Sequence, residues 1–251
     1  VPFGLTAAEM NAWLYHGGGQ EIWDELSAGF NLKPFAAGNT GVQMGGWFNK
    51  EIHGPEDFKG LKIRMPGLGG EVLRRIGAAA VNLPAGEIFP ALQSGAIDAT
   101  EWVGPWNDLA FGFYKVAKFY YYPGFHEPGS TISAAVNLKV WNGLSAEHQA
   151  IITSATAAEN AYTLAEFNAR NNDALVILRK KHGVKLRKFS DETLEVIGSA
   201  AGKVVAEAGS GDAMTRKVFT SMIAFRKSAI AWSKLSEQAF LNARLLPFRY
   251  G

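Results

Sequence analysis

The amino-acid sequence predicts an α/β fold with two lobes and a long helix between them. From Gly54 to Trp102, short apolar segments alternate with short amphipathic segments, and Gly or Pro residues separate them. This alternation is typical of an α/β unit with a mainly parallel sheet. A helical pattern without Gly or Pro then runs from Ser145 to His182, and it would span about 57 Å at about 1.5 Å per residue. A helix of that length exceeds a normal domain, so we expect it to bridge two lobes.

Composition and charge narrow the functional classes. The chain has 251 residues, of which 47% are hydrophobic and 19% charged, as is usual for a globular protein with a sizeable core. The net charge is only +2, and the one tight basic cluster is Arg179-Lys180-Lys181, so nucleic acid is not an expected partner. The absence of cysteine excludes disulfides, thiolate metal sites and thiol catalysis. No apolar run reaches the roughly 18 residues of a membrane span.

The N-terminal segment predicts two helices and a strand. Thr6-Ala7-Ala8-Glu9 has the spacing of a capping box, and apolar residues follow it at helical intervals. Three glycines at 17–19 end this helix, and a second helix is expected from Gln20 to Gly29. Leu32 to Ala36 is predicted to be a short strand.

The alternating region that follows predicts three strands and two helices. Gly67-Leu68-Gly69-Gly70 precedes one of these helices and could hold an anion on its backbone N–H groups. It matches neither the dinucleotide fingerprint nor the P-loop, so it is predicted to be a turn. The expected strands are 61–65, 78–83 and 96–99, and the expected helices are 70–76 and 87–93.

The remaining elements are three strands, a helix and a helical tail. Gly209-Ser210-Gly211 separates the tail from the helix before it. The expected strands are 117–122, 132–138 and 185–189, the helix is 190–208, and the tail runs from Asp212 to about Leu245.

Signatures of catalysis are weak in this sequence. The chain has five histidines, but it contains no Gly-x-Ser-x-Gly elbow and no His-x-x-x-His pair. A carboxylate-rich calcium loop of the EF-hand type is also absent. Candidate functional residues must therefore be sought at the ends of the predicted strands, where open α/β sheets bind their ligands.

Arg64 stands at the end of one predicted strand, just before a loop. Its planar guanidinium could hold a carboxylate through two hydrogen bonds. The alternative is an ordinary surface arginine on an edge strand.

Glu101 directly follows another predicted strand, so its carboxylate should reach the same rim as Arg64. Trp102 and Trp106 could provide flat apolar walls for a small ligand, or they could belong to the core. The turn Phe125-His126-Glu127-Pro128-Gly129 adds an acid and an imidazole, although Pro-Gly turns with polar residues are common.

Three segments between Gly60 and Ala99 together resemble the substrate-binding proteins of tripartite ATP-independent periplasmic (TRAP) transporters, the DctP-like family. The order and spacing of the segments carry more weight than any one of them, and the likeness extends over nearly the whole chain. The segments are Gly60-Leu61-Lys62-Ile63-Arg64-Met65-Pro66, Leu83-Pro84-Ala85-Gly86-Glu87-Ile88 and Ala91-Leu92-Gln93-Ser94-Gly95-Ala96-Ile97-Asp98-Ala99.

Glu101-Trp102-Val103-Gly104-Pro105 and the segment from Tyr121 to Gly129 are similar to one branch of that family, which binds 2-oxoacids such as pyruvate and related hydroxyacids. The resemblance implies that Arg64 holds the ligand carboxylate and that a cation, Na⁺ or Ca²⁺, is bound beside it. An anionic ligand can approach two carboxylates only if a cation neutralises them. The implied cation ligands are Gln43, Glu101, the backbone of Trp102, and Glu127, and the implied substrate-binding residues are Arg64, Gln43, Trp102 and Glu101.

The resemblance also implies a domain organisation, that of a two-lobed periplasmic-binding-protein fold with a hinge. Residues 1–43 and 131–169 would form lobe I, residues 44–130 and 170–208 lobe II, and residues 209–251 a C-terminal helical tail. Members of the family carry several dozen further N-terminal residues, so the N-terminal part of lobe I is expected to be absent here. A sheet edge and apolar surface should then be exposed.

The function that the resemblance implies is that of an extracytoplasmic solute-binding protein, not an enzyme. It would capture a small monocarboxylate with a bound cation and deliver it to the membrane subunits of a TRAP transporter. The expected location is the periplasm, although the chain begins Val1-Pro2-Phe3 and contains no signal peptide. The alternatives are a ligand sensor and a lyase or hydrolase that uses Glu101 or Glu127 as a base.

The helical tail could form a homodimer contact, because it carries apolar residues and few turn signals. The alternative is that it packs back onto the lobes. The apolar residues in question are Ile223, Phe225, Ile230, Trp232 and Leu235.

Overall fold

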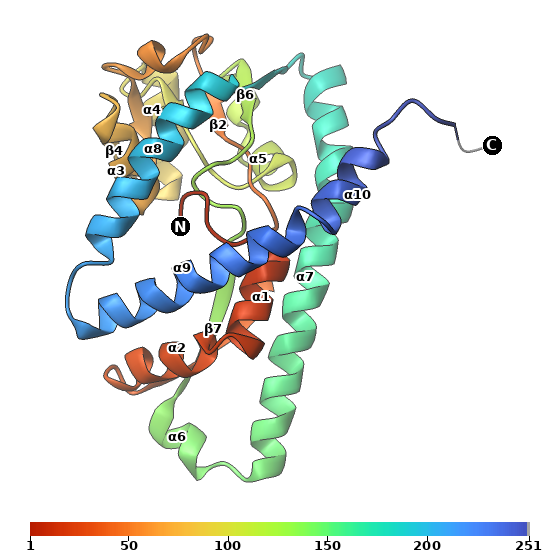
Figure 1. Ribbon diagram of the computed structural model, residues 1–251. Helices are drawn as coiled ribbons and strands as arrows, with labels where there is room; N and C mark the ends of the chain where they lie inside the picture. Colours follow the sequence, from red (N-terminus) through yellow and green to blue (C-terminus); the bar gives the residue numbers. More distant parts are fainter. Residues whose placement is uncertain (250–251) are drawn as a thin grey trace.

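The computed structural model describes residues 1–249, so the last two residues of the predicted 209–251 tail lie outside it. The described chain contains both helices and strands, and the strands form two separate sheets (Figure 1). This confirms the predicted α/β class. None of the described helices combines the length and the apolar character that crossing a membrane requires.

The larger sheet has six strands in the order β4-β3-β5-β2-β6-β8. β3 is parallel to β4 and β5, and β6 is parallel to β8, but β2 is antiparallel to both of its neighbours. The sheet is therefore mainly parallel, as expected, with one strand that the sequence pattern did not predict. The strands are β2 (Gly46–Phe48), β3 (Lys62–Arg64), β4 (Ala79–Val81), β5 (Ala99–Thr100), β6 (Phe119–Tyr122) and β8 (Lys185–Lys188).

Both faces of this sheet are buried. Along β2, Trp47 contributes to one hydrophobic cluster and Phe48 to the other, because successive side chains of a strand point to opposite faces. Helices α3 (Gly67–Arg75) and α8 (Asp191–Ala208) cover the Phe48 face. The Trp47 face packs against α4 (Ala85–Ser94), α5 (Pro105–Phe111) and the end of the long helix α7 (Ala146–Lys180). Two short 3₁₀ helices, η1 (Pro55–Phe58) and η2 (Phe113–Lys115), complete this part.

The prediction of a turn at residues 67–70 was wrong, since these residues form the first turn of α3. Its glycines have a packing role. A Cβ atom at Gly70 would lie 2.1 Å from the Met65 carbonyl oxygen, and one at Gly69 would lie 2.9 Å from the His126 Cβ. Small residues are therefore needed for the helix to begin this close to its own strand and to the 123–130 loop.

The smaller sheet pairs β1 (Leu32–Asn39) with β7 (Thr131–Asn137) in antiparallel register. Each strand has an edge that no other described strand covers. Helices α1 (Ala7–His16), α2 (Gly19–Ala28) and α6 (Leu138–Gly143) accompany this sheet. The Thr6 capping box predicted for α1 is present.

Helix α7 (Ala146–Lys180) runs unbroken for 35 residues, inside the helical range 145–182 that the sequence predicted. It links the two parts of the molecule (Figure 1). In its middle, the Thr163 hydroxyl accepts a hydrogen bond from the backbone N–H of Asn39 on β1, at 3.0 Å. Two turns later, Asn171 Oδ1 accepts one from the backbone N–H of Trp106 on α5, at 3.1 Å.

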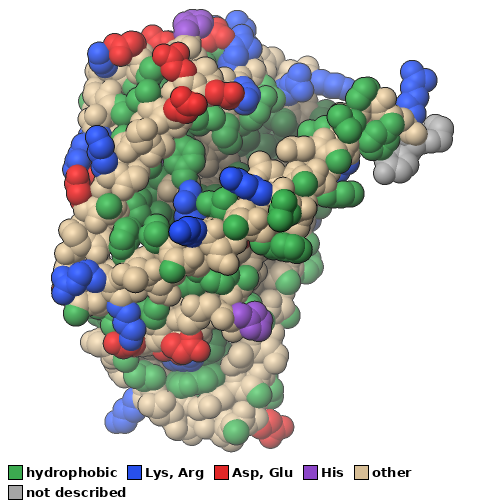
Figure 2. All heavy atoms as spheres, in the orientation of Figure 1, with side chains coloured by type: hydrophobic (Ala, Val, Ile, Leu, Met, Phe, Trp, Pro, Cys, Tyr) green, Lys and Arg blue, Asp and Glu red, His purple; other side chains and the backbone are tan. Residues whose placement is uncertain are grey.

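The C-terminal tail consists of α9 (Ala213–Ser233) and α10 (Glu237–Ala243). The first part of α9 packs against the N-terminal helices, where Trp13 Nε1 donates a hydrogen bond to the Ser221 hydroxyl. Met222, Phe225 and Ala229 continue this packing. Further along, Trp232 is 70% and Leu235 79% exposed, and the end of the tail projects from the molecule (Figures 1 and 2).

Candidate functional site

Arg64 is the last residue of β3, a strand with neighbours on both sides. It is therefore not on an edge strand, and its side chain is buried. Its Nη1 donates to the carboxylate and to the backbone carbonyl oxygen of Glu101, the latter at 3.2 Å. Its Nε lies 3.4 Å from the carbonyl oxygen of Leu83. These contacts fix the guanidinium at the carboxyl end of the sheet.

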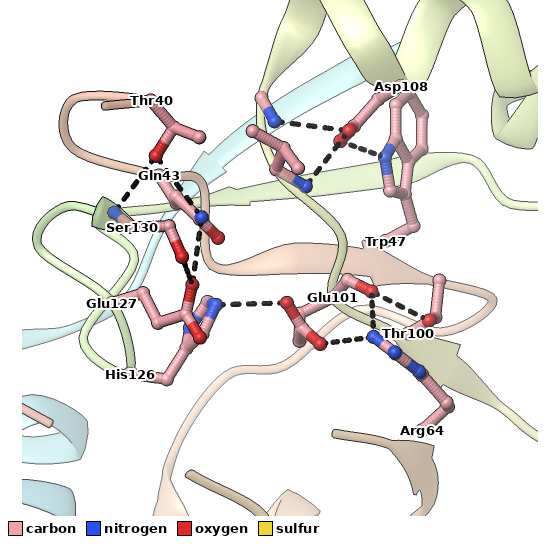
Figure 3. Close-up of polar contacts among 12 residues, drawn as sticks. Thr40, Gln43, Trp47, Arg64, Thr100, Glu101, Asp108, His126, Glu127 and Ser130 are labelled. Atoms are coloured by element: carbon pink, nitrogen blue, oxygen red, sulfur yellow. Dashed lines mark hydrogen bonds and ion pairs between the residues drawn. The ribbon is translucent and has the colours of Figure 1, made fainter. Parts of the chain in front are cut away.

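Glu101 immediately follows β5, the parallel neighbour of β3, and its backbone N–H donates to the Arg64 carbonyl oxygen at 3.2 Å. The buried carboxylate is held on two sides. Oε1 pairs with Arg64 Nη1, and Oε2 lies 3.1 Å from His126 Nε2 (Figure 3). A buried carboxylate is tolerated only with such partners. The structure thus brings Glu101 and Arg64 together at the end of two adjacent strands.

The two tryptophans have different surroundings. The Arg64 guanidinium lies 5.3 Å from the centre of the Trp102 ring, within cation–π range, and Trp102 also packs against Phe111. Trp106 instead packs edge-on against Phe167 of α7, with ring centres 5.2 Å apart. Trp102 therefore borders the Arg64 site, and Trp106 joins the sheet region to the long helix.

Gln43 and Glu127 lie on the two segments that connect β1 to β2 and β6 to β7. The Gln43 side-chain amide donates to Glu127 Oε2 at 2.9 Å, and the Ser130 hydroxyl donates to the same oxygen at 2.9 Å. Gln43 also donates to the Thr40 hydroxyl at 3.3 Å. Its Oε1 atom is buried and has no hydrogen-bond partner among the described residues. Buried polar atoms are rarely left in this state without a ligand or a water molecule to satisfy them.

Glu101 and Glu127 line the same cleft, of about 190 Å³. The structure therefore places two carboxylates on one small space, with Arg64 behind one and Gln43 beside the other (Figure 3). The remaining lining residues are Val1, Pro2, Pro66, Gly67, Leu68, Gly69 and His126.

Asp108 supports this site from behind and was not predicted from the sequence. Its buried carboxylate accepts hydrogen bonds from Trp47 Nε1 at 2.8 Å and from the Tyr120 hydroxyl at 2.7 Å. It also accepts the backbone N–H groups of Val103 and Gly104, at 3.2 and 3.1 Å. Asp108 thus anchors the loop that carries Glu101 and Trp102 to two strands of the sheet.

The environment of Asp108 changes its ionisation. Burial raises the pKa of its carboxyl group to about 6, and the four hydrogen bonds oppose this rise. Asp108 lies in the first turn of α5, and no local pattern in the sequence indicates that Trp47 and Tyr120 meet it.

The oxygen atoms around the cleft suit a hard cation. Two carboxylates and an unpaired amide oxygen are donors that Na⁺ or Ca²⁺ accepts, whereas zinc prefers nitrogen and sulfur. Among residues 1–249 there is no group of three or more His, Asp or Glu side chains arranged for a metal. A cation here would depend on amide and backbone oxygens in addition to the two glutamates.

Comparison with known protein families shows to which family this chain is related. The model of the bacterial extracellular solute-binding proteins, family 7 (DctP), matches residues 1–211. The chain belongs to this family.

Individual relatives agree with this membership. A monocarboxylate 2-oxoacid-binding periplasmic protein of Nostoc sp. is 46% identical over 242 residues, which are 96% of this chain and 66% of the relative. The chain thus spans slightly less than two thirds of that protein. A TRAP periplasmic solute-binding protein from Colwellia psychrerythraea, solved with bound calcium and pyruvate, is 40% identical with a TM-score of 0.91, over 97% of this chain and 74% of that one.

A second solved structure adds another ligand. The TRAP transporter solute-binding protein from Bordetella bronchiseptica is 36% identical with a TM-score of 0.92, over 97% of this chain and 72% of that one. It was solved as a mixed-occupancy dimer, with calcium and picolinate in one active site and the other site apo. The family and these neighbours are solute-binding proteins, and they share the two-lobed α/β fold.

Proposed function

We propose that this chain captures a small monocarboxylate, a 2-oxoacid such as pyruvate or a hydroxyacid, together with Na⁺ or Ca²⁺. One observation carries the proposal. Glu101, which is paired with the buried Arg64, and Glu127, which is hydrogen-bonded to Gln43, line the same small cleft, and Gln43 Oε1 has no partner among the described residues. The positive group offers an anchor for an acid, and the oxygen atoms offer a shell for a cation.

Arg64 is the proposed carboxylate anchor. Its Nη1 and Nε atoms are directed to Glu101 and Leu83, and among the described residues Nη2 makes no hydrogen bond. Nη2 is therefore the atom that can donate to a ligand. The indole of Trp102 beside the guanidinium would form the apolar side of the same subsite.

The cation would be held by Gln43 Oε1, the carboxylates of Glu101 and Glu127, and the carbonyl oxygen of Trp102. The reason is electrostatic. Two glutamates and an incoming acid bring three negative charges, against which Arg64 supplies one positive charge. The resulting charge of about −2 is halved by Na⁺ and cancelled by Ca²⁺, and the ligand can complete the coordination shell of the cation.

The ligands of the solved relatives support one chemical class. Pyruvate and picolinate are both monocarboxylates with a lone-pair donor at the position next to the carboxylate, an oxygen in the first and a ring nitrogen in the second. Such molecules can chelate a cation through two atoms. We therefore expect 2-substituted monocarboxylates to bind here and unsubstituted ones to bind more weakly.

The lobe boundaries are part of the proposal. Residues 1–43 and 131–169 would form lobe I, and residues 44–130 and 170–208 lobe II. All six strands of the larger sheet fall inside the second set, and both strands of the smaller sheet fall inside the first, which supports this division. Gln43 and Glu127 then lie where the chain crosses between lobes, so a ligand that contacts both lobes would favour a closed form.

Delivery to TRAP membrane subunits in the periplasm is the role that fits a member of this family. A ligand-sensing protein would use the same lobes and the same site, and a neighbouring pair of genes for membrane subunits would favour transport. An enzyme that uses Glu101 or Glu127 as a base is the weaker alternative, because both carboxylates are engaged by positively charged or hydrogen-donating groups. Analysis of products after long incubation with 2-oxoacids would distinguish an enzyme from a binding protein.

We also propose a homodimer through the C-terminal tail. Large apolar side chains gather on the projecting part of the tail (Figure 2). The dimeric state of the Bordetella bronchiseptica relative supports pairing in this family. Among the five residues predicted for this contact, Phe225 packs inward against the cluster around Trp13, whereas Trp232 and Leu235 are the most exposed.

Thermal unfolding of the chain with a series of acids tests the proposed ligand class. Pyruvate at 100 times its Kd should raise the free energy of unfolding by about 2.7 kcal/mol when Na⁺ or Ca²⁺ is present. Propionate, which has the same carbon chain without the 2-oxo group, is the matched control and should raise it less. Equal stabilisation by the two acids, or none by either, would contradict the proposed ligand class.

A further inference from the structure

His126 is a buried imidazole next to the proposed cation site. It lies in the loop between β6 and β7, one residue before Glu127, and is only 4% exposed. Its Nε2 atom is 3.1 Å from Glu101 Oε2 (Figure 3). Within residues 1–249 neither ring nitrogen has a well-aligned hydrogen bond.

The imidazole completes the enclosure of the Glu101 carboxylate. Arg64 Nη1 contacts Oε1, and His126 faces the other oxygen, Oε2. The two groups come from separate parts of the chain, Arg64 from the end of β3 and His126 from the segment that leads into β7. The direction in which Glu101 presents its oxygens to the cleft therefore depends on both.

The backbone around His126 leaves the ring little freedom to move. A Cβ atom at Gly69 would lie 2.9 Å from the His126 Cβ, so the first turn of α3 packs directly against this side chain. The Phe125 ring meets the imidazole edge-on, with ring centres 5.6 Å apart. A ring held in this way is suited to fix the position of a neighbouring group.

Unpaired buried nitrogen atoms destabilise a protein, and Glu101 Oε2 is the acceptor within reach of Nε2. In the tautomer that carries its hydrogen on Nε2, His126 can donate to that oxygen after a small rotation of either side chain. Carboxylates that bind metals are commonly oriented by such outer hydrogen bonds, and their removal weakens metal affinity about 10- to 100-fold.

We propose that His126 is a positioning residue that holds Glu101 Oε2 and thereby sets the cation affinity of the site. The inference rests on the proposed function, in which Glu101 is a cation ligand. Both ring nitrogens are shielded from solvent and Nε2 faces Glu101 Oε2, so His126 acts through Glu101.

The experiment is calorimetric titration of Ca²⁺ alone into the 251-residue chain, freed of metal with a chelator and kept in sodium-free buffer. The variants are His126→Phe, which keeps the ring shape without a donor, and His126→Gln, whose amide nitrogen can reach the place of Nε2. We expect His126→Phe to weaken Ca²⁺ binding about 10- to 100-fold and His126→Gln to restore most of it. At saturating Ca²⁺, the affinity of His126→Phe for pyruvate should stay close to that of the wild type.

Each other outcome has a distinct meaning. Wild-type Ca²⁺ affinity in His126→Phe, with binding lost in Glu101→Gln, would overturn the role of His126 and leave the cation site intact. A parallel loss of Ca²⁺ and pyruvate affinity in all His126 variants would show a merely structural role and would overturn it as well. No Ca²⁺ binding by the wild type would overturn the proposed cation site itself and this inference with it.

If His126→Phe fails to fold, His126→Asn replaces it as the comparison with His126→Gln. Both variants are polar, but only the glutamine amide extends as far as Nε2. Equal Ca²⁺ affinity of the two would overturn the proposal.

Discussion

At the scale of single residues, the site depends on groups that satisfy one another across the sheet. Arg64 and Glu101 end adjacent parallel strands, so their side chains meet at one edge. The pair is buried, and removal of either partner would leave an uncompensated charge. The same contact gives Arg64 a fixed direction in which to meet a ligand.

Arg64→Lys should weaken the binding of pyruvate at least tenfold, which corresponds to about 1.4 kcal/mol. A lysine ammonium cannot donate to Glu101 and to a ligand carboxylate in the fixed geometry of the guanidinium. Calorimetry at saturating Ca²⁺ measures the effect. Arg75→Lys, at an exposed arginine of α3, is the matched control and should bind normally. Unchanged affinity in the Arg64 variant would remove Arg64 from the proposed site.

Asp108 should leave a pH signature in stability. Its pKa is about 6 in the folded chain, above its ordinary value, so the folded form holds the proton more tightly than the unfolded form. Its contribution to the free energy of unfolding is therefore fully present below pH 4 and falls by about 3 kcal/mol as the pH rises to about 6. Other carboxylates titrate in the same range, so the informative quantity is the difference between wild type and Asp108→Asn.

The free energy of unfolding of the wild type minus that of Asp108→Asn should decrease between pH 4 and pH 6.5 in chemical denaturation experiments. Above pH 6.5 this difference should stay constant. A pH-independent difference for Asp108→Asn would contradict the assigned ionisation of Asp108.

At the scale of elements, local patterns in the sequence predicted the helices and strand ends that depend on interactions between neighbouring residues. The unbroken helix α7 follows from 35 residues without Gly or Pro, and the positions of Arg64 and Glu101 follow from apolar segments with clear ends. β2 was missed because three residues, the first of them a glycine, give no periodicity. The helical start of α3 was also missed, since its glycines are required by contacts with Met65 and His126 and not by a turn.

Interactions between distant segments explain the remaining gaps in the prediction of the site. The role of Asp108 depends on Trp47 and Tyr120, which are 61 and 12 residues away along the chain. The Gln43–Glu127 hydrogen bond joins residues 84 positions apart. Resemblance to a family indicated Gln43, whereas neither pattern nor resemblance indicated Asp108.

Gly46→Ala should destabilise the fold by about 1 to 3 kcal/mol, a strain typical of a forced backbone position. Gly46 has a φ of 118°, and an added Cβ atom would lie 2.5 Å from the Thr100 carbonyl oxygen on β5. Gly54→Ala, where a Cβ atom would meet nothing within 4 Å and φ is extended, is the control. Equal midpoints of denaturation for the two variants would contradict the packing of β2 against β5.

At the scale of the whole molecule, two sheets share one long helix, and the proposed site lies on the segments that cross between them. The tail is the other feature that acts at this scale. Its first half packs on the N-terminal helices, and its second half leaves large apolar side chains in solvent. Exposed apolar surface of this kind is common where a partner covers it.

The chain should be a dimer in light scattering, and Trp232→Asp combined with Leu235→Asp should convert it to a monomer. The two side chains are 70% and 79% exposed, so the substitutions should leave the fold intact. Phe30→Asp changes a residue that is 74% exposed and lies far from the tail in sequence, and it should leave the dimer unchanged. A wild-type monomer at high concentration would contradict the proposed contact.

The central claim is that the acid and a cation bind together in the cleft between Arg64 and Glu127. Calorimetric titration of pyruvate into the chain, first in chelated sodium-free buffer and then with Ca²⁺ or Na⁺ added, tests it most directly. We predict that pyruvate binds at least tenfold more weakly without a cation, a loss of about 1.4 kcal/mol, and that Glu101→Gln shows no recovery when the cation is added. Full affinity for pyruvate in the cation-free buffer would contradict the claim.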